Sequence, residues 1–501
     1  MLVEMLEVLQ KYYGYTAFRP GQEEVIRHLL AKRDALAVMP TGAGKSICYQ
    51  VPALMMPGIT LVISPLISLM QDQVRSLLSI GVRGAYLNST LTPRQLQLAT
   101  ANARKGVYKI IYAAPERLMT EDFLDFACHS PIALVAVDEA HCISQWGHDF
   151  RPSYLQIADF IDKLPQRPIV AAFTATAADR VQEDIVRCLR LVSPFKLVTG
   201  FDRANLHWSV FTPVDKERFV LDYVTKAGDR SGIIYCNTRK TVEAVARLLQ
   251  DNGFAALPYH AGMDDADRKR YQESFLYDRT RIMVATNSFG MGIDKPNVRY
   301  VLHFNMPPNL EDYYQQAGRA GRDGEPAECI LLYSSSDVKV CQYFIDPDRT
   351  RDSTPTEETP DQKRHRYEQR QRLREMIAYA RSTTCLRQRL LRYFGERFDP
   401  PCHSCSVCSH ETVNQHLVNR ERPCDEALWK LLQQRRDGLA WLAGVPAFAV
   451  VTDQTLREMA SVKPQTMQQM AAINGMGEYK LDRYGKRFLK VIQTYLQSDK
   501  A

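Results

Sequence analysis

The sequence predicts an α/β protein with two parallel-sheet lobes, followed by a helical zinc-binding module and a small all-α C-terminal domain. Short apolar runs recur from about residue 35 to residue 335, and amphipathic stretches of helical length separate them. Such alternation is typical of parallel sheets covered by helices. The series is too long for one sheet, so two α/β lobes are expected.

The runs that carry this prediction are spaced regularly along the chain. They are TLVIS (60–64), KIIYAAP (109–115), IALVAV (132–137), IVAAFTAT (169–176), GIIYC (232–236), RIMVAT (281–286) and RYVLHF (299–304). A break is predicted at Gly200-Phe201-Asp202. The first lobe is therefore expected over residues 1–200 and the second over 201–345.

After Tyr333 the character of the sequence changes. Prolines punctuate a polar stretch, and a basic, helical-looking segment with a cysteine cluster follows it. We expect the zinc-binding module over residues 346–410 and a linker over 411–423. Apolar residues then recur at helical spacing, which predicts a helical domain over 424–501.

Charge and composition favour a protein that is neither secreted nor membrane-spanning and that carries one strongly basic segment. The formal net charge of the 501 residues is +7, but eleven Lys and Arg face only three Glu between Lys363 and Arg397. That segment is a candidate surface for a phosphate backbone, and the alternative is a solvated helix face without a partner. No signal peptide or membrane-spanning run is present. We expect a cytoplasmic, nucleoid-associated monomer with reduced thiols.

A phosphate-binding loop is predicted at MPTGAGKS, Met39–Ser46, which follows a short apolar run. A strand that turns sharply into a helix points backbone N–H groups and the positive helix end at one spot. The glycines let the backbone come close, the lysine reaches the β- and γ-phosphates, and the serine ligates Mg²⁺. Met39 stands where the general pattern has glycine. The candidate ligands are Thr41, Gly42, Gly44, Lys45 and Ser46.

The string VDEAH, Val137–His141, ends another apolar run. Asp138 can hold Mg²⁺ and Glu139 can polarise an attacking water, as in other nucleotide hydrolases. His141 completes the candidate catalytic group in this lobe.

A third candidate group lies in QQAGRAGRDG, Gln315–Gly324. Its two arginines are three residues apart, so we expect them on one helical turn. A guanidinium that reaches a phosphate site stabilises charge that develops during transfer, and the alternative is an ordinary basic surface helix. We expect these side chains to close the nucleotide site from the second lobe. The candidates are Gln315, Arg319 and Arg322.

The stretch SQWGHDFR, residues 144–151, follows the carboxylates directly. Aromatic faces can stack on unpaired bases and arginine can hold phosphate, whereas the alternative is a pair of core aromatics. The candidate DNA-binding residues are Trp146, His148, Phe150 and Arg151.

Four cysteines form a predicted metal site: Cys385, Cys402, Cys405 and Cys408. Four thiolates suit tetrahedral Zn²⁺, and a closed site of this kind is structural. His403 and His410 are rival ligands, but adjacent ligands at 402 and 403 are sterically awkward. Further along, Gly475 and Gly477 can expose backbone amides to a phosphate, or can be structural glycines in a module that binds protein or nothing.

Taken together, these motifs resemble the RecQ family of superfamily 2 helicases. The resemblance covers roughly residues 1–410 and, more loosely, the C-terminal piece. The matching strings are GYTAFRPGQ (14–22), SPLISLMQDQ (64–73), DEAHCISQWGHDFRP (138–152), FTATA (173–177), IIYCNTR (233–239) and VATNSFGMGIDKPNVR (284–299). The resemblance implies RecA-like lobes, an HRDC-like C-terminal domain, and recognition of adenine by Tyr15, Arg19 and Gln22.

The resemblance also implies an activity. The implied activity is that of a DNA helicase that depends on ATP, Mg²⁺ and Zn²⁺ and moves 3′ to 5′. The implied substrates are single-stranded and forked DNA in repair and recombination, and a single-strand-binding protein is a candidate partner. RecQ proteins typically carry a winged-helix domain before the HRDC domain, and residues 410–423 are too few to form one. The alternative is therefore a DNA-dependent ATPase that binds or remodels DNA without efficient unwinding. An RNA helicase is a weaker third possibility, since no feature selects the 2′-hydroxyl.

Overall fold

The computed structural model describes residues 2–65, 67–88, 91–144, 150–177, 179–289, 295–346, 360–410 and 424–498. Contacts divide the chain into two compact units. The first combines the N-terminal lobe, residues 1–200, with the C-terminal domain after residue 422. The second contains the other lobe and the region up to residue 422.

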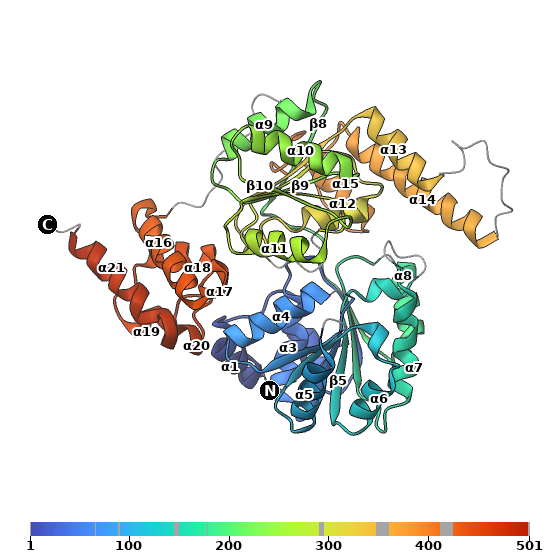
Figure 1. The fold of residues 1–501 in the computed structure, drawn as a ribbon, viewed down its shortest axis with the longest axis vertical. Coiled ribbons are helices and arrows are strands. Elements are labelled where there is room, and N and C mark those ends of the chain that lie inside the picture. Colours follow the sequence, from blue (N-terminus) through green and yellow to red (C-terminus); the bar gives the residue numbers. More distant parts are fainter. Residues whose placement is uncertain are drawn as a thin grey trace. The chain divides into compact units, whose positions relative to one another are not determined.

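The N-terminal lobe is built on a parallel sheet in the order β3-β4-β2-β5-β6-β1-β7. Helices α3 (Lys45–Met55) and α4 (Ile67–Ser79) cover one face of it, and α6 (Glu121–Cys128), α7 (Gln156–Asp162) and α8 (Asp179–Cys188) cover the other (Figure 1). The strands are β1 (Ala35–Val38), β2 (Ile59–Ile63), β3 (Gly84–Leu87), β4 (Ile110–Ala113), β5 (Ile132–Val137), β6 (Ile169–Thr174) and β7 (Phe195–Val198).

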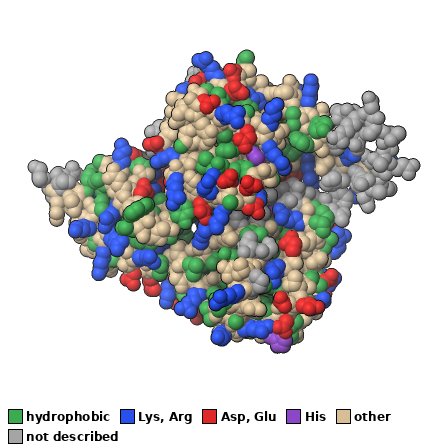
Figure 2. All heavy atoms as spheres, viewed as in Figure 1, with side chains coloured by type: hydrophobic (Ala, Val, Ile, Leu, Met, Phe, Trp, Pro, Cys, Tyr) green, Lys and Arg blue, Asp and Glu red, His purple; other side chains and the backbone are tan. Residues whose placement is uncertain are grey.

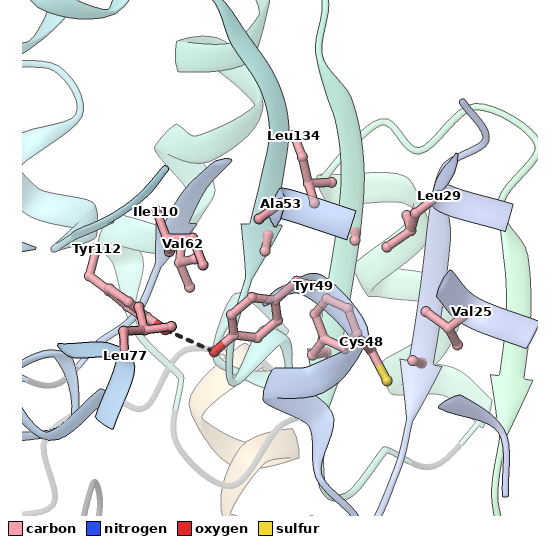
Figure 3. Close-up of a cluster of buried hydrophobic side chains, with 14 of the residues drawn as sticks. Val25, Leu29, Cys48, Tyr49, Ala53, Val62, Leu77, Ile110, Tyr112 and Leu134 are labelled. Carbon is pink, nitrogen blue, oxygen red and sulfur yellow. Dashed lines mark hydrogen bonds between the residues drawn. The ribbon is translucent and has the colours of Figure 1, made fainter. Parts of the chain in front are cut away.

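Further helices lie before the first strand of this sheet or between its strands along the chain. They are α1 (Leu2–Tyr13), α2 (Gln22–Leu30) and α5 (Pro93–Arg104), with short 3₁₀ turns at Pro115–Arg117, Ala140–Ile143 and Pro152–Leu155. Helix α5 begins with a full capping box, in which the side chains of Thr92 and Gln95 each bond the other's backbone. In the core beneath α2 and α3, Val25, Cys48 and Tyr49 pack against alternate residues of the strands (Figure 3).

The second lobe has a parallel sheet in the order β10-β11-β9-β12-β13-β8. Helices α9 (Lys216–Ala227) and α10 (Arg239–Asp251) pack on one face, and α11 (Asp265–Leu276) and α12 (Leu310–Ala317) lie on the other (Figure 1). The strands are β8 (Leu206–Phe211), β9 (Gly232–Tyr235), β10 (Ala256–Tyr259), β11 (Ile282–Ala285), β12 (Tyr300–His303) and β13 (Ala327–Leu332). The prediction of two parallel-sheet lobes is thereby confirmed.

Three helices follow this sheet: α13 (Ser335–Ile345), α14 (Pro360–Ala380) and α15 (Leu386–Tyr393). The basic segment is therefore two helices rather than the single helix that its composition indicated. The chain turns between them, and Cys385 forms the N-cap of α15.

The C-terminal domain is helical, as predicted. Its elements are α16 (Glu426–Ala443), α17 (Ala447–Val450), α18 (Asp453–Val462), α19 (Met467–Ala471), α20 (Glu478–Lys480), a π-helical turn (Leu481–Gly485) and α21 (Lys486–Ser498). Leu428, Leu456 and Phe488, from three of these helices, meet in its core. Within the described ranges, no helix has both the length and the apolar character that a membrane span needs.

Candidate nucleotide site and zinc centre

The strand register of the N-terminal lobe brings four motifs to one edge. Val38 at the end of β1 pairs with Thr174 on β6, and Val137 at the end of β5 lies level with Ala172 of β6 and Ile63 of β2. The carboxyl ends of these strands therefore adjoin. The P-loop, the VDEAH string, the FTATA string and the start of SPLISLMQDQ leave the sheet at this edge, where ligands bind in open parallel sheets.

The P-loop turns through two glycines with positive φ, Gly42 at 85° and Gly44 at 80°. A Cβ on Gly44 would lie 2.5 Å from Nε2 of Gln22, so this position requires glycine for space as well as for conformation. The Gln22 amide donates to the carbonyls of Ala43 and Gly44 at 3.0 and 3.1 Å. Arg19 donates to the Gly42 carbonyl at 2.5 Å. Two residues expected to read adenine thus also hold the loop.

Lys45 turns back over the loop, with its Nζ donating to the Met39 carbonyl at 3.0 Å. Met39 is fully buried, and its backbone N–H donates to the Thr174 carbonyl at 2.9 Å. A core side chain therefore occupies the position where the general pattern has glycine. The ammonium thus lies against carbonyls at the start of the P-loop, within the loop that is expected to hold a phosphate.

Asp138 extends the strand pairing by one residue, since its N–H donates to the Ile63 carbonyl at 2.8 Å. Burial raises the pKa of its carboxyl to about 7, the charge of Glu139 adds to that rise, and the ammonium of Lys45 opposes it. A carboxylate that is hard to ionise in isolation is stabilised by a cation. A divalent ion near Asp138 would therefore favour the ionised form of this carboxyl.

The side chains of Glu139 and His141 follow Asp138, and Thr174 of the FTATA string holds His141 in place. His141 is buried, and its Nδ1 lies 2.8 Å from Oγ1 of Thr174 and 3.3 Å from a carboxylate oxygen of Glu139. Glu139 adopts the left-handed conformation at φ 48°, which turns its side chain out of the strand direction. Tyr154 donates to the Asp138 carbonyl at 2.9 Å and fixes the same turn from the other side.

Of the aromatic-rich segment, Trp146 and His148 lie outside the described residues. Phe150 is half-buried, and Arg151 donates to the Pro65 carbonyl at 3.2 Å. The backbone N–H of Arg151 also donates to the Cys142 carbonyl at 2.9 Å. The end of the segment is thus tied both to the VDEAH turn and to the loop before α4.

The expected arginine pair lies in the second lobe, but not on a helical turn. Helix α12 ends at Ala317, and Arg319 and Arg322 follow in the turns beyond it. The expectation of one helical turn was wrong because the glycines of the string end the helix. Gln315 remains on α12 and is half-buried.

Arg203 organises these turns although it is more than a hundred residues away in sequence. Its guanidinium donates to the carbonyls of Gly318 at 2.8 Å, Ala320 at 2.9 Å and Gly321 at 2.6 Å. These bonds satisfy the carbonyl of Gly318, the C-cap of α12, and tie down two carbonyls of the turns that follow it. No motif in the sequence marks Arg203 for this position.

The four predicted cysteines come together in the second unit. The sulfur atoms of Cys385, Cys402, Cys405 and Cys408 all lie within 4.8 Å of one another. Backbone N–H groups of Gln388, Ser404 and Cys408 each point at one of these sulfurs at 3.4 Å. Among the residues that the structure describes, no other three or more Cys, His, Asp or Glu side chains lie close enough together to share a metal ion.

The Cys385 thiol is a poor acid without a cation. Burial raises the pKa of Cys385 to about 12, and the neighbouring cysteines contribute to that rise. A tetrahedral Zn²⁺ displaces these protons and takes four thiolates, so the donor set fits zinc.

The zinc loop also extends the sheet of the second lobe. The N–H of Trp208, on the edge strand β8, donates to the Ser404 carbonyl at 3.1 Å, and the N–H of Ser406 donates to the Trp208 carbonyl at 2.9 Å. Arg387 pairs with Asp202 at 2.5 Å and donates to Oγ of Ser404 at 3.0 Å. The module thus covers an otherwise open sheet edge.

Several arginines of the basic segment bond to other side chains of the protein and are not simply exposed to solvent. Arg387 is buried in its pair with Asp202, Arg370 pairs with Asp346 at 2.7 Å, and Arg381 donates to the Tyr333 hydroxyl at 2.8 Å. Arg374 and Arg392 are exposed. Figure 2 shows Lys and Arg side chains spread over the face in view, with acidic side chains among them. A phosphate-binding role is therefore open only to the exposed part of the segment.

The backbone around Gly475 and Gly477 in the C-terminal domain contacts the backbone of the N-terminal lobe at Gly14. The N–H of Gly475, expected to meet a phosphate, donates to the Gly14 carbonyl at 3.1 Å. A Cβ on Gly14 would lie 2.3 Å from the backbone nitrogen of Gly477, so the two backbones touch directly. Tyr479 packs on Gly81, after α4. In this structure the Gly475 amide is therefore paired within the chain.

Comparisons with known proteins agree with the order of these parts. Residues 19–185 match the DEAD/DEAH box helicase family and residues 215–324 match the helicase conserved C-terminal domain. Residues 335–409 match the RecQ zinc-binding family, and residues 425–492 match the HRDC domain.

Relatives match nearly the whole chain. The ATP-dependent DNA helicase RecQ of Bacillus subtilis (strain 168) is 35% identical over 602 aligned positions, which cover 99% of each chain. The protein of the same name from Pasteurella multocida (strain Pm70) is also 35% identical, over 98% of this chain and 94% of its own. The first alignment is longer than the 501 residues of this chain, so that relative contains segments that this chain lacks.

A solved structure with the same fold is that of Mss116p bound to ssRNA and AMP-PNP. It superposes with a TM-score of 0.58 at 17% identity and covers 78% of this chain and 88% of its own. At that identity the likeness concerns the fold of the lobes alone.

We expect one Zn²⁺ per chain, removed by the substitution Cys405→Ser. Loss of a ligand releases the metal and with it the folding free energy of the module, so residues after 360 become sensitive to protease while the lobes stay folded. Elemental analysis and limited proteolysis measure both effects. Cys128→Ser, at a half-exposed cysteine outside the cluster, is the matched control. Zinc-free protein with an intact module would contradict the assignment.

Gly477→Ala should undock the C-terminal domain from the N-terminal lobe. The new methyl would lie 3.0 Å from the carbonyl oxygens of Lys11 and Tyr12, while φ at this residue, −63°, suits alanine. We expect faster hydrogen exchange at the amides of residues 11–14.

The control for this variant is Gly438→Ala in α16, where no atom lies within 4 Å of the new methyl. That change should stabilise the C-terminal domain by about 0.5–1 kcal/mol and leave exchange at residues 11–14 unaltered. Equal hydrogen exchange at residues 11–14 in both variants would show that the Gly477 contact does not hold the C-terminal domain on the N-terminal lobe.

Proposed function

The chain belongs to the RecQ family of ATP-dependent DNA helicases, and on that premise we propose that it unwinds DNA with 3′ to 5′ polarity in repair and recombination, using Mg²⁺-bound ATP. The observation that carries the proposal is the convergence of the P-loop, Asp138 and Thr174 at one sheet edge, in a chain 35% identical to a DNA helicase over 99% of both. Polarity rests on the family resemblance alone.

The roles that we propose for the nucleotide site follow from its contacts. The loop amides and Lys45 bind the phosphates, Ser46 and Asp138 hold Mg²⁺, and Tyr15, Arg19 and Gln22 read the adenine. Bound Mg²⁺ would neutralise charge on the phosphates and keep Asp138 ionised against its raised pKa. Glu139, oriented beside His141, takes the proton of the attacking water.

The second lobe is proposed to supply positive charge to the reaction. Arg319 and Arg322 would stabilise charge that develops on the transferred phosphoryl group. Arg203 supports this role because its three hydrogen bonds fix the turns that carry both guanidiniums. Gln315 is proposed to assist from the end of α12.

DNA contact is proposed for the aromatic-rich segment. Trp146 and Phe150 would stack on bases, and His148 and Arg151 would approach the phosphate backbone. The support is the attachment of Arg151 to both the VDEAH turn and the loop before α4, which gives DNA at this segment a short path to the nucleotide site. A single-strand-binding protein is a candidate partner, and a monomer is the proposed working form.

An ATPase that remodels DNA without unwinding it is not proposed. The relatives matched over almost the full chain are named helicases. Unwinding of 3′-tailed and 5′-tailed duplexes, with and without ATP, tests both activity and polarity. Release of strands from 5′-tailed duplexes alone would contradict the proposed polarity, and release from neither would contradict unwinding.

Lys45→Ala should abolish DNA-stimulated ATP hydrolysis and leave binding to single-stranded DNA largely unchanged. The ammonium that meets the phosphates is lost, whereas the proposed DNA contacts lie elsewhere. Phosphate release and fluorescence anisotropy measure the two properties. The control is Lys105→Ala, at an exposed lysine outside every motif. Near-normal hydrolysis in Lys45→Ala would remove the P-loop from the mechanism.

Trp146→Ala should uncouple hydrolysis from DNA. We expect basal ATPase to persist and stimulation by single-stranded DNA to fall by about ten-fold, the loss of roughly one stacked base. Phe150→Ala should act in the same direction. Trp441→Ala, at a tryptophan that is 82% exposed in the C-terminal domain, is the control and should have no effect. Unchanged stimulation in Trp146→Ala would identify it as a core aromatic.

A further inference from the structure

A group of polar side chains lies buried between the P-loop helix α3 and helix α4. Gln50 of α3 donates to the Gln73 carbonyl oxygen at 3.2 Å and to the Tyr112 hydroxyl at 3.3 Å. The Tyr13 hydroxyl, at the end of α1, donates to Gln50 at 2.9 Å. Tyr49 completes the group, with its hydroxyl 3.4 Å from that of Tyr112 (Figure 3).

Packing alone does not require these groups. Their neighbours in the same core are apolar, among them Val74 and Leu77 of α4. Apolar side chains of equal volume would fill the space without the cost of removing amides and hydroxyls from water. Hydrogen bonds add direction, which apolar contacts lack, so they fix how α3 and α4 lie against each other.

This polar group lies between the helix that follows the P-loop and the helix that follows the loop bonded by Arg151. On one side, Tyr49 and Gln50 lie on the first turns of the helix that begins at Lys45 and Ser46. On the other side, Gln73 lies on α4, and the loop before α4 accepts the hydrogen bond of Arg151 at the Pro65 carbonyl. The Gln50–Gln73 amide pair, with the Tyr112 hydroxyl in contact with both amides, thus offers one path by which a shift of α3 on phosphate binding would reach the aromatic-rich segment.

We propose that Gln50 and Gln73 are positioning residues that couple the nucleotide site to the DNA-contacting segment. This inference rests on the proposed function, because it assumes that DNA stimulates hydrolysis. Neither amide touches the nucleotide. Their hydrogen bond holds α4 at one setting relative to α3, so that DNA bound near Arg151 and nucleotide bound at Lys45 favour the same arrangement.

The test compares Gln73→Met and Gln50→Met with Val74→Ala in the full-length protein. Methionine keeps the length and nearly the volume of glutamine but removes the hydrogen bonds, whereas Val74→Ala loosens the packing of α4 without touching the amides. For each variant the basal kcat, the KM for ATP, the kcat at saturating single-stranded DNA and the Tm are measured.

We expect both methionine variants to keep basal kcat and the KM for ATP within about two-fold, and to lose DNA stimulation by about five-fold or more. Val74→Ala should lower Tm and keep its stimulation. The double variant Gln50→Met/Gln73→Met should lose no more stimulation than Gln50→Met alone, because that variant already removes the hydrogen bond between the two amides.

Two results would overturn the inference. One is full DNA stimulation in both methionine variants, and the other is an equal loss in Val74→Ala, which would make packing of α4 the cause. Either result requires a wild-type protein that DNA stimulates. A wild-type ATPase that ignores DNA would overturn the proposed function instead, and this inference with it.

Discussion

The parallel register of β1, β6, β5 and β2 is the constraint on which the nucleotide site depends. Each strand contributes one short string of residues at its carboxyl end, and pairing of the strands places those strings side by side. Further contacts refine this arrangement. Gln22 and Arg19 hold the P-loop from outside the sheet, and Thr174 orients His141 from within it.

Much of this could be predicted from sequence because the signals are local. The P-loop, the VDEAH string and the cysteine spacing each lie within a few neighbouring residues, apart from Cys385, and the central strands are apolar on both faces. The strands that the apolar runs did not reveal are mostly at sheet edges: β3, β7, β8 and β10. Edge strands are less buried, as the half-exposed β7 shows, and β10 contains a proline.

The parts that could not be predicted depend on contacts between distant residues. Arg319 and Arg322 were expected on a helix because their spacing suits one, yet Arg203 holds them in turns from across the lobe. Arg387 counted as surface charge in the composition, but it pairs with Asp202 beneath the zinc loop. Charge counts and spacing describe which residues are available, and the tertiary partners decide which of them face a ligand.

The closest part of the contact between the C-terminal domain and the N-terminal lobe is made by main chain. Gly14 and Gly477 lie too close for any side chain, and Gly475 contributes an amide rather than a functional group. Such a junction carries little chemical identity of its own, since nearly every sequence offers the same backbone atoms. A helical domain taken from a relative could therefore be grafted here if it keeps its glycines, because the close approach restricts the glycine positions while the other backbone contacts do not depend on side-chain identity.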